Sequence, residues 1–278
     1  VATSRSCNRS CISGQLRMLE QTLGDRLFVR QGRGLRLTEV GQVVYRYADE
    51  IFGLGREMQD GRKGRPHGRP LRLTVGISDM VPKLIAYRVL QPALSMENPV
   101  QLVCQEDSQE RLLAELAEHR LDVVLSDTPV TSAMRVKAFN HLLGASEVTL
   151  FGTADLAKRY RRDFPRSLHG APFLLPVEGS SLRRSLDQWF ELAKITPARV
   201  GEFKDRALMK AFGSAGAGLF PAPSAIEKEV KERYRVVAVG RLHSVIERFY
   251  AISVERKLKH PAVVTVCEAA TNQLFGDK

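Results

Sequence analysis

Apolar residues recur at helical spacing near the start of the chain. Ile12, Leu16, Leu19 and Leu23 follow one another at steps of four, three and four, so they lie on one face of a helix that ends near Gly24. An ordinary amphipathic helix and a helix that reads DNA are equally compatible with this segment alone.

The residues after this helix favour a hairpin. Residues 27–30 (LFVR) and 35–37 (LRL) are typical of short strands, and the turn between them, Gln31-Gly32-Arg33-Gly34, is of the kind that needs positive φ. A helix followed by an arginine-tipped hairpin is the winged helix-turn-helix arrangement, in which the helix enters the major groove and the wing contacts the adjacent backbone or minor groove. We therefore predict a partial winged helix-turn-helix DNA-binding domain over residues 1–38.

A long helix is predicted over residues 39–60, with Thr38 at its N-cap position. Its apolar residues, at steps of four, three, four, three and four, are Val40, Val44, Tyr47, Ile51, Leu54 and Met58. The resulting period of 3.5 is that of a coiled-coil seam, so we expect this linker helix to form a homodimer or homotetramer. Burial of the same residues against their own domain is the alternative.

A Gly-, Pro- and Arg-rich stretch, residues 61–70, is predicted to be a flexible linker because it has no apolar side chain to place in a core. From Leu71 onward, strand-like and helix-like segments alternate, which predicts an α/β fold with right-handed βαβ units and a parallel sheet. We expect residues 71–278 to form a bilobed effector-binding domain. Lobe I would cover about 71–144 and 250–278, and lobe II about 145–249.

Each lobe is expected to contain both strands and helices. The expected strands are 71–77, 100–105, 121–125, 148–152, 173–175, 199–203, 218–221, 235–239 and 249–254, and the expected helices are 81–95, 108–118, 154–161, 182–193, 207–213 and 261–274. Ligands of bilobed α/β folds bind between the lobes, at the carboxyl ends of strands and the N-termini of helices.

Positive charge is concentrated at the start of the chain. The first 69 residues hold 13 Lys and Arg against 7 Asp and Glu, which is about half of the total net charge of +11 in a quarter of the length. This excess favours double-stranded DNA as a partner, although a solvated basic surface has the same composition. We expect Ser13, Gln15 and Arg17 to lie near the major groove and Arg30, Arg33 and Arg36 to contact phosphates or the minor groove.

Polar residues at strand ends and helix starts are the candidates for effector binding. They are Ser78, Asp79, Ser126, Asp127, Ser180, Ser181, Phe203 and Asp205. Oxygen-rich groups of this kind suit a small polar ligand or a hard cation such as a monovalent metal ion. Capping of a helix is the alternative for each aspartate taken singly.

Several other classes of protein are disfavoured. Cys7, Cys11, Cys104 and Cys267 form no CxxC pair, so neither a zinc site nor a disulfide framework is expected, and no cofactor is indicated. No apolar run is long enough to span a membrane, and we expect a cytoplasmic protein. An enzyme lacks support because no nucleophile elbow, GxGxxG turn, HExxH helix or Walker loop is present. A solute-binding protein would require an export signal.

The chain resembles the LysR family of transcriptional regulators. Phe28-Val29-Arg30 followed by Leu37-Thr38-Glu39-Val40-Gly41 is similar to the family's F-x-R…L-T-x-x-G signature, and residues 12–20 are similar to its recognition-helix pattern. Shorter segments, above all 207–213 (ALMKAFG), resemble the family's sodium/proton-antiporter-regulator group. That resemblance implies an activator of an antiporter gene that responds to sodium or lithium. A regulator of another regulon, or a bilobed ligand-binding protein that does not bind DNA, is the alternative.

The first residues depart from the family pattern. A complete module of the family has two further helices before the recognition helix, and residues 1–11 (VATSRSCNRSC) show neither apolar periodicity nor a family motif. We therefore expect a DNA-binding module that is truncated or frameshifted at its start. Isolated helices of this length are marginally stable, so DNA binding would be impaired.

Overall fold

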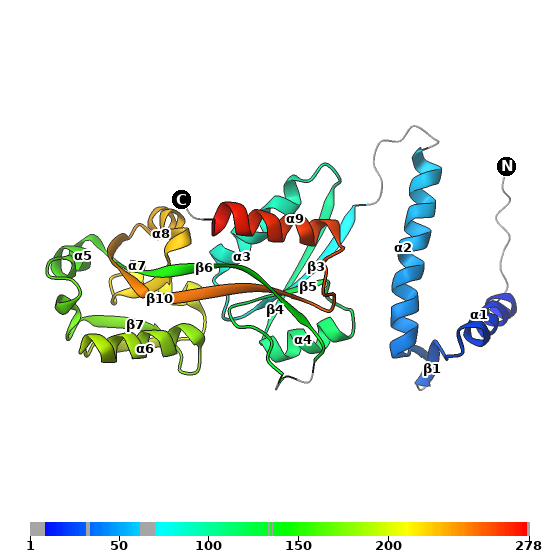
Figure 1. Cartoon of the computed structure of the whole chain (residues 1–278), viewed down its shortest axis with the longest axis horizontal. Helices are drawn as coiled ribbons and strands as arrows, with labels where there is room; N and C mark the ends of the chain where they lie inside the picture. The colour runs from blue at the N-terminus through cyan, green and yellow to red at the C-terminus, as the bar shows by residue number, and fades with distance from the viewer. Residues whose placement is uncertain (1–8, 32–33, 62–69, 133, 135, 277–278) are drawn as a thin grey trace. The chain divides into compact units, whose positions relative to one another are not determined.

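The computed structural model describes residues 9–31, 34–132, 134 and 136–276, apart from 62–69. The chain divides into two compact units, Val1–Arg69 and Pro70–Lys278 (Figure 1). Within the described ranges no helix is long and apolar enough to cross a membrane.

The N-terminal unit contains two helices and a hairpin. The elements are α1 (Arg9–Leu23), β1 (Phe28–Gln31), β2 (Gly34–Leu37) and α2 (Glu39–Gly61). α1 begins three residues before the expected start at Ile12. The predicted hairpin is confirmed as an antiparallel pair, in which Phe28 lies opposite Leu37. Gly32 and Arg33 of the expected turn lie outside the described residues.

The signature residues of this unit form one connected set of contacts. The Glu20 carboxylate accepts hydrogen bonds from the backbone N–H groups of Leu27 (2.7 Å) and Phe28 (3.3 Å). Thr38 caps α2 as expected, because its hydroxyl accepts from the Gly41 N–H at 2.9 Å. A Cβ at Gly41 would lie only 2.0 Å from the Leu27 carbonyl oxygen, so only glycine permits this approach. These contacts fix α1, the wing and α2 to one another.

The C-terminal unit has two lobes joined by two long strands (Figure 1). Lobe I contains β3 (Leu71–Ser78), α3 (Lys83–Leu90), β4 (Val100–Asp107), α4 (Gln109–Ala117), β5 (Val123–Ser126) and α9 (Pro261–Ala269). Lobe II contains α5 (Ala154–Arg161), β7 (Pro172–Pro176), α6 (Ser181–Ala193), β8 (Ala198–Phe203), α7 (Arg206–Ser214), β9 (Phe220–Pro223) and α8 (Glu227–Tyr234). The connecting strands are β6 (Phe139–Gly152) and β10 (Val237–Ser253). Short 3-10 turns follow α3, α5 and β9, and a π turn follows α9.

The expectation of a parallel sheet was wrong for three of the six strand pairs described in the C-terminal unit. β3 pairs in parallel with β4 and β5, and β7 pairs in parallel with β8, as βαβ units require. However, β10 runs antiparallel to β5 and β6, and β9 antiparallel to β6, in a sheet of order β4-β3-β5-β10-β6-β9. The sheet is therefore mixed, because the long strands cross between the lobes.

The first part of β6 and the middle of β10 have an irregular hydrophobic pattern. Residues 139–147 and 240–248 alternate poorly between buried and exposed positions and include Gly144 and Gly240. The β6–β10 register shifts in this region, so period-2 alternation is interrupted. This is why the sequence predicts only the C-terminal end of β6 and the two ends of β10. α8 was also missed, because Val230 is its one buried residue and the rest of the helix is strongly polar.

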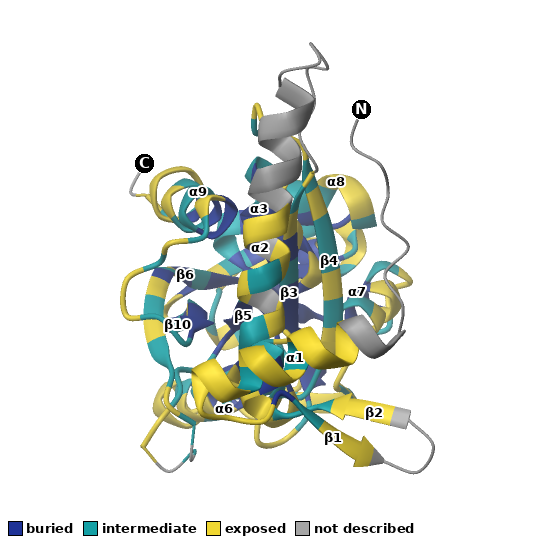
Figure 2. Cartoon of the chain, turned by 90° about the vertical axis from the view of Figure 1, so that its right-hand side faces the viewer, coloured by how far each residue is buried: buried dark blue, intermediate teal, exposed yellow. Residues whose placement is uncertain are grey.

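Apolar burial follows the sheet. Among the described residues, three separate apolar clusters form the core: one around Leu112 and Val124 in lobe I, one around Phe173 and Leu186 in lobe II, and a larger one that includes residues of both lobes. The N-terminal unit differs, because most described residues of α1 are exposed (Figure 2). The two units therefore bury very different shares of their apolar side chains.

Candidate functional sites

The residues expected to contact DNA bases lie on α1 and are exposed: Ser13, Gln15 and Arg17. At about 100° of rotation per residue, Ser13 and Arg17 lie one turn apart on one side of the helix. Gln15 lies on the other side, although all three residues were expected near the major groove. A single groove-facing surface of α1 therefore contains Ser13 and Arg17 but not Gln15.

The wing arginines also separate. Arg30 lies opposite Leu35, and Arg36 lies opposite Val29. Directly paired residues point to the same face of a hairpin and successive residues alternate, so Arg30 and Arg36 lie on opposite faces. Both are exposed, whereas Arg33 lies outside the described residues.

In the C-terminal unit, two polar contacts join the lobes. Asp127, directly after β5, accepts a hydrogen bond from the hydroxyl of Ser181, the first residue of α6, at 2.5 Å. Asp79, directly after β3, forms an ion pair with Lys204 at 2.8 Å. Two of the expected residues from lobe I thus contact lobe II directly, and Ser181 is the expected residue that one of them meets.

The other expected residues have local structural roles. Ser180 caps α6 by accepting from the Arg183 N–H at 3.3 Å, and Asp205 caps α7 by accepting from the Ala207 N–H at 2.7 Å. Ser126 is buried and accepts from the Thr128 N–H at 3.2 Å. Asp205 therefore caps a helix, as the alternative interpretation of the aspartates expected. Asp79 and Asp127 instead contact residues of the other lobe.

Ser78 and Phe203 complete the expected set. Ser78 is buried at the end of β3 and accepts from the Met80 N–H at 3.5 Å. Phe203, at the end of β8, packs against Phe212 of α7 with ring centroids 5.2 Å apart. A cavity lies beside Asp127 and Ser181, and neither Ser78 nor Phe203 lines it.

A cavity of about 440 Å³ lies between the lobes at the Asp127–Ser181 contact. Its polar lining includes Asp127, Ser181, Arg184, Gln188, Glu247 and Arg248. Both signs of charge and several neutral polar groups therefore face one space, whose size is typical of small-ligand sites. Among the described residues no group of three or more His, Cys, Asp and Glu could hold a metal ion. We call this space the cleft cavity.

A buried charge cluster behind the cleft cavity was not anticipated from the sequence. Arg206 at the start of α7 donates to Glu247 of β10 at 2.6 Å, and both side chains are at most 4% exposed. Lys210, one turn along α7, is equally buried and donates to the Arg206 carbonyl at 3.1 Å. Burial, reinforced by Arg206, lowers the pKa of Lys210 to about 8, and burial raises the pKa of Glu247.

The cluster keeps unused hydrogen-bonding capacity. Nε and Nη2 of Arg206 and Oε2 of Glu247 are buried and find no hydrogen-bond partner within the part of the chain that the structure describes. Glu247 also lines the cleft cavity, so the cluster and the cavity share a residue. The sequence held a signal for this cluster. Arg206 and Lys210 are four residues apart in a helix that is otherwise mostly apolar, so the two basic side chains lie on the same face of it.

Two family models match this chain. One, described as "LysR substrate binding domain", matches residues 66–274, and the other, "Bacterial regulatory helix-turn-helix protein, lysR family", matches residues 2–42. The chain belongs to the LysR family. The second match begins at residue 2, so it includes the first residues, for which no family pattern was recognised in the sequence. LysR proteins are transcriptional regulators rather than enzymes, and as a group they bind DNA and small-molecule effectors and form oligomers.

Individual LysR proteins are similar over most of this chain. The transcriptional activator protein NhaR of Escherichia coli K12 is 37% identical over 264 residues, which cover 95% of this chain and 86% of NhaR. ArgP from Mycobacterium tuberculosis superposes with a TM-score of 0.59 at 18% identity, over 98% of this chain and 90% of ArgP. Vibrio fischeri DarR, solved in complex with DNA, superposes with a TM-score of 0.54 at 16% identity, over 95% of this chain and 89% of DarR. The two structures show the shared LysR fold alone.

Proposed function

We propose that this LysR regulator activates a sodium/proton antiporter gene from the cytoplasm, in response to sodium, lithium or a small polar effector. The observation that supports this is the 37% identity with NhaR over nearly the whole chain. The resemblance of the ALMKAFG run to the antiporter-regulator group adds to it. Arg206 and Lys210 of the buried cluster flank or belong to that run.

The effector is proposed to bind in the cleft cavity. Asp127 and Ser181 line it from opposite lobes, and Glu247 contributes a carboxylate. Ser78, Asp79, Ser126, Ser180, Phe203 and Asp205 would position these groups through the strand ends and helix starts. A ligand that competes for the Asp127–Ser181 and Asp79–Lys204 contacts would favour one arrangement of the lobes over another, which is how an effector shifts a population.

DNA binding is assigned to α1 and the wing. Ser13, Gln15 and Arg17 are proposed to approach bases, and Arg30, Arg33 and Arg36 to approach phosphates. Loss of one wing arginine by Arg36→Ala should weaken binding to all sequences and reduce the slope of log K against log salt by about one. An unchanged slope would contradict that role for Arg36.

Dimer or tetramer formation is assigned to α2. Val40, Tyr47 and Ile51 of the expected seam are exposed in the single chain, with Ile51 65% exposed, and Val44 is partly exposed. Exposed apolar residues at a 3.5 spacing are what a partner helix covers. Ile51→Lys should shift the particle toward the monomer in light scattering, whereas a monomeric wild type at micromolar concentration would contradict the seam.

A gel shift with the full chain tests the proposed function. The probe is an antiporter-gene promoter, with an unrelated duplex of equal length as the competitor. Binding in NaCl is compared with binding in KCl at the same concentration, because counterion release is then equal. We expect promoter-specific binding that changes between the two salts and an Asp127→Asn variant that loses the difference. The absence of promoter preference would overturn the regulatory target, and equal behaviour in both salts would overturn sodium as the effector.

A further inference from the structure

A second cavity lies where the crossing strands join the lobes. Its volume is about 650 Å³, within the range of small-molecule sites. It shares no lining residue with the cleft cavity. The charged residues that line it are Arg88, Glu147, Glu227, Lys228, Lys231 and Arg241. We call it the hinge cavity.

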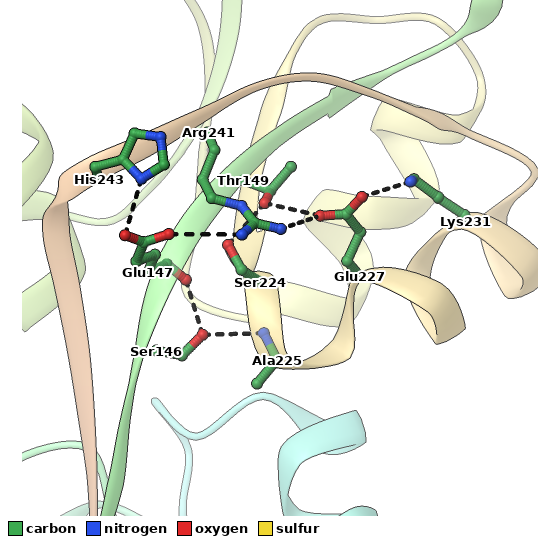
Figure 3. Close-up of polar contacts among 9 residues, drawn as sticks. All are labelled: Ser146, Glu147, Thr149, Ser224, Ala225, Glu227, Lys231, Arg241 and His243. Atoms are coloured by element: carbon green, nitrogen blue, oxygen red, sulfur yellow. Dashed lines mark hydrogen bonds and ion pairs between the residues drawn. The ribbon is translucent and has the colours of Figure 1, made fainter. Parts of the chain in front are cut away.

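Arg241 lies between two carboxylates in the hinge cavity (Figure 3). Its Nη1 is 3.7 Å from Oε2 of Glu147, and its Nη2 donates to Oε2 of Glu227 at 3.1 Å. Lys231 also donates to Glu227, and His243 Nδ1 lies 2.9 Å from Glu147. Burial alone would raise the pKa of Glu227, but the Lys231 and Arg241 hydrogen bonds outweigh it and lower that pKa. Both carboxylates are therefore already engaged by basic groups.

Positive charge remains in excess. Four Lys and Arg residues line the cavity against two Glu residues. Arg88 is paired at 2.5 Å with Glu229, outside the lining. The side chain of Lys228 is exposed and makes no ion pair or hydrogen bond with any residue that the structure describes. A cavity lined by an ammonium without a carboxylate partner and by a half-exposed guanidinium favours an anion over a cation.

One wall of the hinge cavity is apolar and fixed. Leu274 and Phe275 contribute it from the C-terminal turn of lobe I, and the Phe275 ring stacks on Phe249 with centroids 5.4 Å apart. A Cβ at Gly144 would lie 2.2 Å from the Phe275 side chain, so a glycine in the crossing strand admits this packing. α8 of lobe II contributes Glu227, Lys228 and Lys231 to the lining of the same cavity. A molecule in the cavity would therefore touch both lobes.

We infer that the hinge cavity is a second ligand site, which binds a small organic anion carrying a carboxylate or phosphate group. The oxyanion accepts hydrogen bonds from Lys228 and Arg241, while the rest of the molecule packs on Phe275. Because both lobes form the walls, an occupant biases the lobe arrangement independently of the cleft effector. This inference does not depend on the identity of the regulated gene.

Isothermal titration calorimetry of the full chain tests the site. Citrate and inorganic phosphate are the two probes, each titrated at constant ionic strength set with KCl. We expect at least one probe to bind, and its identity distinguishes a carboxylate from a phosphate ligand. The Lys228→Gln/Arg241→Gln variant should bind it at least about tenfold more weakly, since each lost contact is a charge-assisted hydrogen bond. Lys158→Gln, on an exposed face of α5, is the matched control and should bind like the wild type.

Three results would overturn the inference. One is that neither probe binds the wild type, and another is that the double variant binds as tightly as the wild type. The third is that Arg184→Gln, which alters the cleft cavity, abolishes binding while the double variant retains it. Thermal unfolding verifies that each variant is folded. If the double variant is not, Lys228→Gln alone serves, because the Lys228 side chain is exposed and forms no ion pair within the described part of the chain. Promoter binding without anion binding would refute this site and leave the proposed function intact.

Discussion

Two charged clusters in the effector domain differ chiefly in their access to water. In the cluster behind the cleft, the paired Arg206 and Glu247 side chains are 4% and 2% exposed, whereas Arg241 and Glu147 at the hinge are 46% and 33% exposed. Desolvation of a buried pair costs several kcal/mol per ion, which the pair must recover from its own attraction. Exposed pairs lose little hydration and gain little stability. Mutations in the buried cluster should therefore change the free energy of unfolding strongly, whereas the side chains of the hinge cluster can exchange their partners for a ligand at little cost.

Breaking the buried pair should give the largest effect. Glu247→Leu leaves the Arg206 guanidinium uncompensated in the interior and should lower the free energy of unfolding by about 3–5 kcal/mol. Urea unfolding followed by fluorescence of Trp189, the single tryptophan, measures it in the effector domain. Arg206→Met/Glu247→Leu is the control, because it removes both charges and should be closer to the wild type than Glu247→Leu. If Glu247→Leu were as stable as the double variant, the uncompensated Arg206 charge would not be the cause of the loss.

The buried Lys210 should make stability depend on pH. Its folded pKa of about 8 lies below the ordinary lysine value of 10.5, so between these values the unfolded chain binds more protons than the folded chain. Stability contributed by this group therefore rises as pH increases from 8 to 10.5, by at most about 3 kcal/mol. The measurement is the unfolding free energy of Lys210→Met minus that of the wild type across this window. This value should fall as pH rises, because only the wild type gains stability, and a constant value would refute the shifted pKa.

Arg183 of α6 provides an intermediate case. Its side chain is only 1% exposed, but its carboxylate partners Asp187 and Glu202 are 43% and 38% exposed. Arg183→Met leaves carboxylates that water can reach, together with the Pro176 carbonyl that Arg183 bonds at 2.8 Å. We expect a loss of about 2 kcal/mol, less than for Glu247→Leu, in the same Trp189 assay. A loss larger than that of Glu247→Leu would show that the exposure of the partners does not decide the cost.

Local features of this fold could be predicted from the sequence, and distant contacts could not. Thr38 at the start of α2 was recognised because an N-cap acts within three residues, and Asp127 and Ser181 because strand ends and helix starts are visible in the pattern. The Arg206–Glu247 pair joins residues 41 positions apart through β10, whose central residues lack a clear strand periodicity. The sequence therefore indicated the cleft but not the charges behind it, nor the hinge cavity assembled by the same crossing strands.

The hinge network should contribute least to stability. Arg241→Gln removes contacts to Glu147 and Glu227, but both carboxylates keep other partners, His243 and Lys231, and remain accessible to water. We expect the free energy of unfolding to change by less than about 1 kcal/mol, and the change to diminish as salt is raised from 0.05 to 1 M, roughly the range in which screening of exposed charges becomes strong. The same urea assay measures it, with Lys158→Gln as the control for the loss of one positive charge. If Arg241→Gln cost as much as Glu247→Leu, the hinge arginine would be a structural residue that a ligand could not recruit.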